Sequence, residues 1–138
     1  MRPKSYTKSI LAILAIAIAA CDLSVGPHDS LVPQQLLFVV YGPHIRQGIY
    51  SLESDGQSIK RLTPDSLSVS THYSCSPDGE TILFSAYYNQ NSDIWRISRS
   101  SKSVTRVISD PSVDESPQWL HEGSGFVFRS NRSGRYSI

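Results

Sequence analysis

The chain has 138 residues, with 13 Lys and Arg against 12 Asp and Glu. This length holds at most one ordinary domain. Because no stretch is strongly basic, the sequence gives no support to nucleic-acid binding through phosphate neutralisation.

The first twenty residues have the layout of an export signal. Positive charges at Arg2, Lys4 and Lys8 precede an uninterrupted apolar run over residues 10–20. A membrane-spanning helix needs about 20 apolar residues, so this run is too short for a comfortable span. A positive start, a short apolar segment and small residues at its end are typical of a secretory signal. We therefore expect a signal helix over residues 1–20 that is removed on export, with an uncleaved anchor helix as an alternative.

The end of this segment resembles the lipobox of bacterial lipoproteins. Ile18-Ala19-Ala20-Cys21 places an aliphatic residue and two small residues before a cysteine. The resemblance implies cleavage before Cys21, lipidation of its thiol and a location at the bacterial cell envelope, anchored to the membrane and facing the periplasm or the exterior. Two or more lipid chains give stable anchoring. A plain secretory signal with a chance cysteine is the alternative.

Residues 21–35 are expected to form the lipidated cysteine and a tether. The stretch DLSVGPHDSLVPQQ holds Gly, two Pro and scattered polar residues without periodicity, which is typical of a linker. Cys75 is the second of two cysteines. Since Cys21 is assigned to the lipid, we expect Cys75 to be a buried, unpaired thiol.

Residues 36–138 contain an internal repeat. The apolar triplet Ile82-Leu83-Phe84 recurs 44 residues later as Phe126-Val127-Phe128, and Leu36-Leu37-Phe38 precedes it by 46 residues. Residues 49–52 precede the similar residues 94–97 by 45. A period near 45 residues is the spacing of a four-stranded propeller blade.

The segment Ser76-Pro77-Asp78-Gly79 predicts a corner between two strands. Proline presets φ for a tight turn, aspartate bonds to nearby backbone, and glycine accepts positive φ. This turn and its neighbours divide the middle unit into four expected strands. In chain order, strands A to D cover Thr71–Cys75, Thr81–Tyr87, Asp93–Ser98 and Val104–Ile108, and the turn between strands B and C is expected at Asn89–Ser92.

These units resemble TolB-like β-propeller repeats, which are WD40-like. The second unit carries Cys75-Ser-Pro-Asp-Gly79 and Asp93-Ile-Trp95, and the third carries Asp114-Glu-Ser-Pro-Gln-Trp119. Cys75 stands where the pattern has tryptophan, and residues 120–123 replace Ser-Pro-Asp-Gly. The resemblance covers residues 36–138. It implies an all-β fold that binds protein or peptide partners, as TolB does in the Tol–Pal system. A small β-sandwich is the alternative fold.

The strand inventory predicts an incomplete propeller of about two and a half four-stranded antiparallel blades. The units cover about 36–70, 71–114 and 115–138, with strands B-C-D, A-B-C-D and A-B-C. A ring normally needs four to eight blades. Three explanations stay open: a fragment of a longer propeller, self-association that completes the propeller, or a short array stabilised by a partner.

The sequence shows no catalytic, cofactor or metal motif. It has no Gly-x-Ser-x-Gly elbow and no phosphate-binding glycine loop, and its four histidines are scattered. We therefore expect no enzymatic activity. The alternative is the gating propeller of a prolyl-oligopeptidase-type serine peptidase whose catalytic domain is missing from this chain.

The candidate binding residues are few. We expect Asp78 to cap its turn, with a ligand contact as the alternative. Asp114 and Glu115 are expected to precede strand A, near the mouth of a propeller channel, where they could bind a partner. For Trp95 and Trp119, packing between blades is the favoured interpretation.

Overall fold

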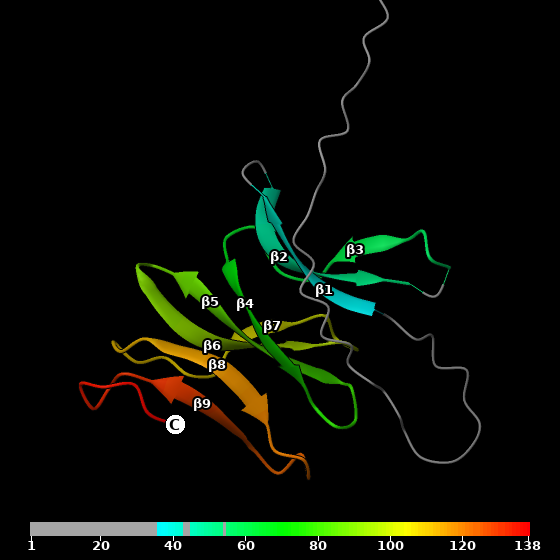
Figure 1. Ribbon diagram of the computed structural model, residues 1–138. Helices are drawn as coiled ribbons and strands as arrows, with labels where there is room; N and C mark the ends of the chain where they lie inside the picture. The colour runs from blue at the N-terminus through cyan, green and yellow to red at the C-terminus, as the bar shows by residue number, and fades with distance from the viewer. Residues whose placement is uncertain (1–35, 43–44, 54) are drawn as a thin grey trace, which may run out of the picture.

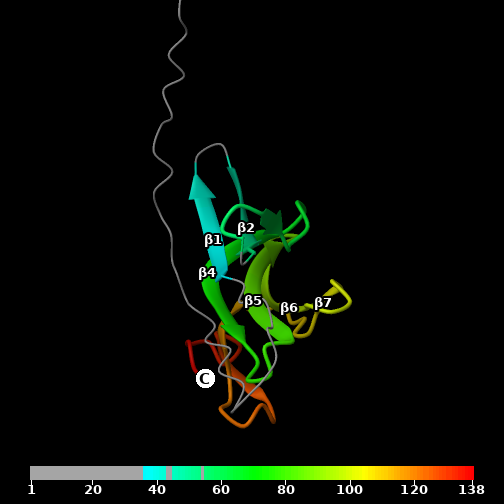
Figure 2. The same cartoon turned by 90° about the vertical axis from the view of Figure 1, so that its right-hand side faces the viewer.

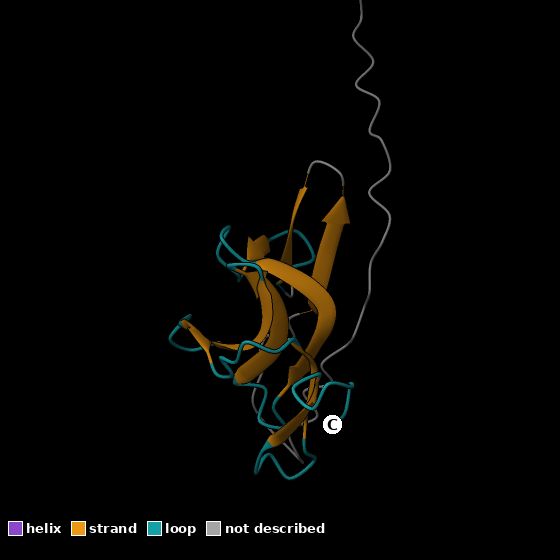
Figure 3. Ribbon diagram, turned by 90° about the vertical axis from the view of Figure 1, so that its left-hand side faces the viewer, coloured by secondary structure: helices purple, strands orange, loops and turns teal. Residues whose placement is uncertain are grey.

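The computed structural model describes residues 36–138 except for residues 43, 44 and 54. Within this part the regular structure is entirely β, as the strands and loops of Figure 3 show. The expected all-β, partial propeller is confirmed. The expected signal helix, Cys21 and the tether over residues 21–35 lie outside the described residues.

The described strands form three antiparallel sheets in chain order (Figure 1). The first sheet contains β1 (Leu36–Gly42), β2 (Ile45–Leu52) and β3 (Ile59–Arg61). The second contains β4 (Ser68–Cys75), β5 (Thr81–Tyr88), β6 (Asn91–Ser98) and β7 (Val104–Arg106). The third contains β8 (Asp114–Trp119) and β9 (Phe126–Ser130). The second sheet lies between the other two, because β4 contacts β2 on one side and β8 on the other (Figure 2).

The third sheet is shorter than expected. Its predicted strand C is reduced to one isolated bridge between Ser130 and Ser137. A single residue pair does not make a strand, so the described sheet ends at β9. The bridge nevertheless matches the repeat. Ala86 pairs with Asp93 in the second sheet, and these two residues precede Ser130 and Ser137 by 44 residues each. Ser137 therefore occupies the strand C position.

The corners between strands A and B follow the predicted turn chemistry. Ser76 and Thr81 close the corner through Ser76 N–Thr81 O at 2.8 Å, and Gly79 N donates to Ser76 O at 2.8 Å. Gly79 and Gly123 both have φ of 69°, a backbone conformation that residues with a side chain rarely adopt. The two units thus share one corner geometry, although residues 120–123 lack the Ser-Pro-Asp-Gly sequence.

The connection between strands B and C is where the units differ in length. In the second sheet Asn89 and Gln90 have φ of 48° and 66°, as a two-residue type I′ hairpin requires. β6 therefore begins at Asn91, earlier than the predicted Asp93. In the first sheet the register shifts between Val40 and Gly42, which accommodates the extra residue of that unit.

The core lies between the first and second sheets. Leu37, Val39 and Ile49 from the first sheet are at most 1% exposed, and they share one cluster with Ile82 and Phe84. Burying a side chain of this size contributes about 1.5–3 kcal/mol. Alternation along β1 and β2 directs these side chains toward the second sheet.

Cys75 differs from the sequence expectation. It is partly buried against the core, but it is disulfide-bonded and not an unpaired thiol. The expectation excluded a disulfide only because the other cysteine was assigned to a lipid.

Candidate functional site

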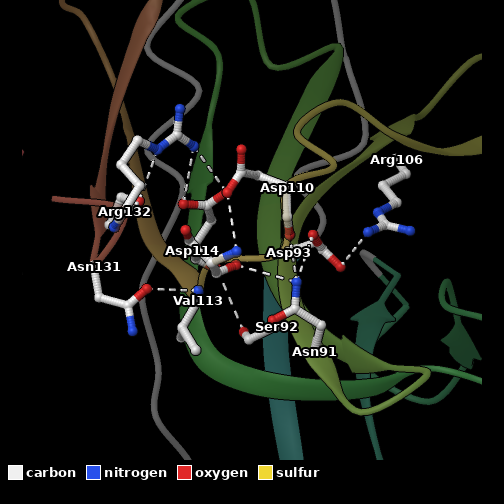
Figure 4. A network of polar contacts seen from close by, with 11 residues as sticks. Asn91, Ser92, Asp93, Arg106, Asp110, Val113, Asp114, Asn131 and Arg132 are labelled. Carbon is white, nitrogen blue, oxygen red and sulfur yellow. Dashed lines mark hydrogen bonds and ion pairs between the residues drawn. The ribbon is translucent and has the colours of Figure 1, made fainter. Parts of the chain in front are cut away.

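A polar network joins the second and third sheets at the end where β8 begins (Figure 4). Asn91, the first residue of β6, donates from Nδ2 to the carbonyl oxygens of Asp110 at 2.6 Å and Ser112 at 3.1 Å. These two residues lie in the linker between β7 and β8. One amide therefore fixes the path of the linker into the next sheet.

Asp114 and Arg132 form the centre of this network. Both carboxylate oxygens of Asp114 accept from one guanidinium nitrogen of Arg132, at 3.1 and 3.0 Å. The Asp114 side chain is 0% exposed, whereas that of Arg132 is 46% exposed. Arg132 also donates from Nε to Ser130 Oγ at 2.9 Å and lies over the Phe128 ring at 5.3 Å. Asp114 is thus an internal anchor that holds a partly exposed cation in place.

The turn after β9 completes the connection. The side chain of Asn131 accepts at Oδ1 from Val113 N at 2.8 Å, and the backbone N–H of Asn131 donates to Val113 O at 3.3 Å. Ser92 Oγ donates to the carbonyl of Asp114 at 3.3 Å. The linker is therefore bonded to the sheets on both sides of it.

A second buried carboxylate pairs with an arginine on the neighbouring strand. Asp93 is 0% exposed and lies 2.8 Å from Arg106, although its Oδ2 lacks a well-aligned hydrogen bond. Gly48 and Arg61 hold the equivalent positions of the first unit, 45 residues earlier. A Cβ at Gly48 would lie 2.8 Å from Nε of Arg61, so the arginine folds into the space of the missing side chain. Arg61 pairs with Asp65 instead.

Glu115 lies beside Asp114 but is more accessible. It pairs with Arg129 at 2.7 Å, with side chains 28% and 48% exposed. The Arg129 guanidinium stacks over the Tyr136 ring at 4.0 Å. We call Glu115, Arg129 and Tyr136 the charged cluster. Asp114 and Glu115 both belong to β8, so they form the start of strand A and do not precede it.

The two tryptophans contact neighbouring elements in different ways. The backbone N–H of Trp119 donates to Ser74 Oγ of the second sheet at 3.0 Å, and the Trp119 ring meets Phe126 edge-on at 5.9 Å. Trp95 meets Tyr88 edge-on at 5.7 Å and packs against the core between the first two sheets. Both indole N–H groups are buried without a hydrogen-bond partner. Each tryptophan therefore lies at a junction between sheets.

The predicted turn residues form a closed set of hydrogen bonds. Asp78 Oδ1 accepts from Ser76 Oγ at 2.5 Å and from Glu80 N at 3.0 Å. The Ser76 hydroxyl, followed by the Glu80 amide, lowers the pKa of Asp78. Glu80 accepts from Ser100 Oγ at 2.6 Å, and this hydroxyl is the main cause of the lowered pKa of Glu80. This geometry ties the A–B corner to the C–D turn.

The described residues show no arrangement for metal chemistry. No group of three or more His, Cys, Asp or Glu side chains in this part of the chain is placed to hold a metal ion. His72 and His121 are exposed and lie in separate units. His28 and His44 lie outside the described residues.

No helix within the described ranges is long and apolar enough to cross a membrane.

The polar network is the feature that sequence reasoning missed. Ser130-Asn131-Arg132 follows the apolar triplet at residues 126–128 with one residue between them, but the pairing of Arg132 with Asp114 was not predicted. A usable indication existed, because an acidic residue at the start of strand A and an arginine after strand B occur in the same unit. The partners of Asn91 are backbone carbonyls, which sequence cannot reveal.

Comparison with known proteins identifies the fold. No family model and no curated protein matches the chain. Among solved structures, TolB from Acinetobacter baumannii is 28% identical with a TM-score of 0.64, over 75% of this chain and 26% of that one. A protein described as TolB from Agrobacterium tumefaciens is 23% identical with a TM-score of 0.64, over 75% and 37%.

An acylaminoacyl peptidase is 16% identical with a TM-score of 0.50, over 70% of this chain and 15% of that one. This likeness shows the fold alone. The chain spans between about a quarter and two fifths of the length of the two TolB structures, at 26% and 37%. The described part of the chain therefore has a TolB-like β-propeller fold, in the form of a partial propeller.

Proposed function

We propose that this chain is a lipid-anchored protein of the bacterial cell envelope whose TolB-like propeller binds a protein or peptide partner. The similarity to TolB from Acinetobacter baumannii, at 28% identity and a TM-score of 0.64, carries the proposal. No catalytic role is assigned to the chain. The polar network supports a binding role, because it holds charged side chains rigidly at one end of the sheets.

Lipidation of Cys21 would supply the membrane anchor. The chain has two cysteines, and a thiol that carries a lipid thioether cannot also form a disulfide. Lipidation of Cys21 and an intramolecular disulfide at Cys75 therefore exclude each other, which gives the proposal a second readout.

Labelled palmitate tests the anchor. Wild-type protein expressed in a bacterial host should incorporate the label, and Cys21→Ala should not. Intact mass under non-reducing conditions should show the lipid adduct in wild type and none in Cys21→Ala. No incorporation into wild type, or label retained in Cys21→Ala, would contradict lipidation.

We place partner contact at the charged cluster and at the exposed side of Arg132. Asp114 is fully buried, so its part in binding is to position Arg132. Glu115 and Arg129 present opposite charges on neighbouring strands, and Tyr136 adds an aromatic surface. Aromatic residues and arginine are common at the centres of protein interfaces.

Photo-crosslinking in cells tests this surface. A photoreactive amino acid at position 115 or 129 should yield an adduct with a discrete partner. The same group at Thr105, an exposed residue of β7, serves as the matched control and should yield none. Equal adducts at all three positions, or none at any, would contradict a binding role for the charged cluster.

The gating propeller of a serine peptidase is the second candidate. The likeness to an acylaminoacyl peptidase favours it at the level of fold alone. Genomic DNA downstream of the coding region distinguishes the two functions. Further propeller units support the binding module, and a Gly-x-Ser-x-Gly segment supports the peptidase.

Self-association is a further route to a larger array, because each outer sheet of the described part has one face without a neighbouring sheet. Analytical ultracentrifugation separates a monomer from an assembly of several copies.

A further inference from the structure

Two of the five N–H donors of Arg132 have no acceptor within the described part of the chain. Nη2 donates to both carboxylate oxygens of Asp114, at 3.1 and 3.0 Å, and Nε donates to Ser130 Oγ at 2.9 Å. These contacts use three of the five donors of a guanidinium. The other terminal nitrogen, Nη1, carries the remaining two, and Figure 4 shows it pointing away from Asp114.

The guanidinium is held in one orientation. It lies over the Phe128 ring at 5.3 Å, in addition to its contacts with Asp114 and Ser130. The Asp114 side chain is 0% exposed, and a buried ion pair contributes little net stability because both groups lose water. The pair instead fixes the direction of the Nη1 donors. A donor that is already in place loses less freedom when it binds.

These donors lie on the side of the third sheet that faces the second. Tyr88 precedes Arg132 by 44 residues and packs against the core between the first two sheets. Phe84 precedes Phe128 by the same spacing and belongs to that core. The equivalent positions in the third unit therefore face the second sheet. The contacts that orient Arg132 all come from within residues 110–132.

The charges around Arg132 favour an uncharged acceptor. Asp114 already neutralises the Arg132 cation. The hydrogen bonds from the backbone and the hydroxyl of Ser112 are the main causes of the lowered pKa of Asp110, and the charge of Arg132 lowers it further. One cation thus faces two carboxylates, so a third carboxylate would be opposed by like charge. A carbonyl oxygen accepts from N–H donors without adding charge.

We propose that Nη1 of Arg132 donates to an uncharged carbonyl oxygen of the partner protein, from a peptide bond or an amide side chain. Asp114 is the positioning residue for this contact. The inference rests on the proposed binding function and deepens it, because it names the group that the partner presents. The contact supplies specificity through its direction, because it adds no net charge to the interface.

Photo-crosslinking from position 115 in altered backgrounds tests the contact. Arg132→Lys keeps a cation beside Asp114 but lacks the Nη1 donors. The adduct yield should therefore fall roughly three- to tenfold, as expected for the loss of one hydrogen bond. Arg135→Lys changes an exposed arginine of the same turn. As the matched control, it should alter the yield less than about twofold. Urea midpoints of the purified variants check that both are folded.

Asp114→Asn tests the positioning role while Arg132 stays in place. In wild type, NMR should show slower exchange with water for the Nε–H of Arg132 than for that of Arg135. In Asp114→Asn the Arg132 Nε–H should exchange faster, and the adduct yield should fall with it. A purely structural role for Asp114 would lower the urea midpoint and leave this exchange unchanged, which would overturn the positioning role.

The outcomes separate the inference from the proposed function. A partner carboxylate would be attracted by lysine as well as by arginine, so a yield retained in Arg132→Lys would overturn the inference alone. Equal losses in Arg132→Lys and Arg135→Lys would also overturn it. If position 115 gives no adduct in wild type, the proposed function is contradicted, and the inference that rests on it is contradicted too.

Discussion

The two junctions between neighbouring sheets are built from different chemistry. The junction of the first and second sheets is apolar, with Val39, Ile82 and Phe84 fully buried. The junction of the second and third sheets instead uses polar contacts, from the side-chain amide of Asn91 and from Ser74, beside the buried Asp114–Arg132 pair within the third unit. Apolar contact is non-directional and supplies most of the stabilisation, whereas hydrogen-bonded polar groups fix a single arrangement. The repeat therefore joins its units in two ways, one for stability and one for position.

The largest expected effect is at the apolar junction. Phe84→Ala removes a fully buried ring and should lower the free energy of unfolding by about 3–5 kcal/mol, because transfer and cavity terms add. Urea unfolding followed by tryptophan fluorescence measures it. A loss below about 1 kcal/mol would show that the first two sheets do not depend on this contact.

The polar junction should respond less, and unequally, at two arginines. Arg132→Ala leaves the buried carboxylate of Asp114 unpaired, and because Arg132 is half exposed we expect a loss of about 2 kcal/mol. Arg129→Ala breaks a surface pair and should cost less than about 1 kcal/mol. The same unfolding experiment compares them. Equal losses would mean that burial of Asp114 has no energetic consequence.

Two glycines separate backbone strain from contact between units. Gly56 and Gly123 have φ of 66° and 69°, so alanine at either should cost about 1–2 kcal/mol. A Cβ at Gly123 would also lie 3.4 Å from Pro77 in the corner between β4 and β5, whereas Gly56 has nothing within 4 Å. Gly123→Ala should therefore be the more destabilising by a few tenths of a kcal/mol. The reverse order in urea midpoints would argue against close contact of the two corners.

The smallest expected effect is a loss of stability at acidic pH that comes from the turn between β2 and β3 of the first sheet. The Ser58 hydroxyl, followed by the Ser58 and Gln57 amides, lowers the pKa of Asp55 from 3.8 to about 2. A lowered folded-state pKa stabilises the fold above the unfolded value, and this stabilisation is lost as pH falls from about 4 toward 2.

The urea midpoint at pH 5 and at pH 2.5 measures this dependence. Between these two pH values, the urea midpoint of wild type should fall further than that of Asp55→Asn, which lacks the titrating group. Asp78 and Glu80 shift in the same direction, so only the difference between the two proteins reports on Asp55. Identical losses would contradict the role of the turn.

The fold was largely predictable because the repeat consists of local sequence patterns, namely apolar triplets and turn residues. The apolar triplets at 82–84 and 126–128 and the turn at 76–79 predicted strands and corners that the structure contains. Strand boundaries differed from the prediction where backbone conformation determines the turn, as at Asn89 and Gln90 before β6. No side-chain pattern predicts that a glutamine will adopt positive φ.

The polar junction was less predictable because it depends on contacts that are distant in sequence. Asn91 bonds to carbonyls 19 and 21 residues away, and Asp114 bonds to Arg132 over 18 residues. A repeat comparison did not help, because Val69 holds in β4 the pairing position that Asp114 holds in β8. Only a folded arrangement shows that these groups meet.

The uneven B–C connections have a consequence for modifying the molecule. The units differ by one or two residues in spacing, yet the strands keep equivalent pairs, since the shift between Val40 and Gly42 takes up the difference. Peptide tags grafted at this connection should therefore leave the sheets in place. An affinity epitope or a fluorophore could be carried there without altering how the three sheets stack.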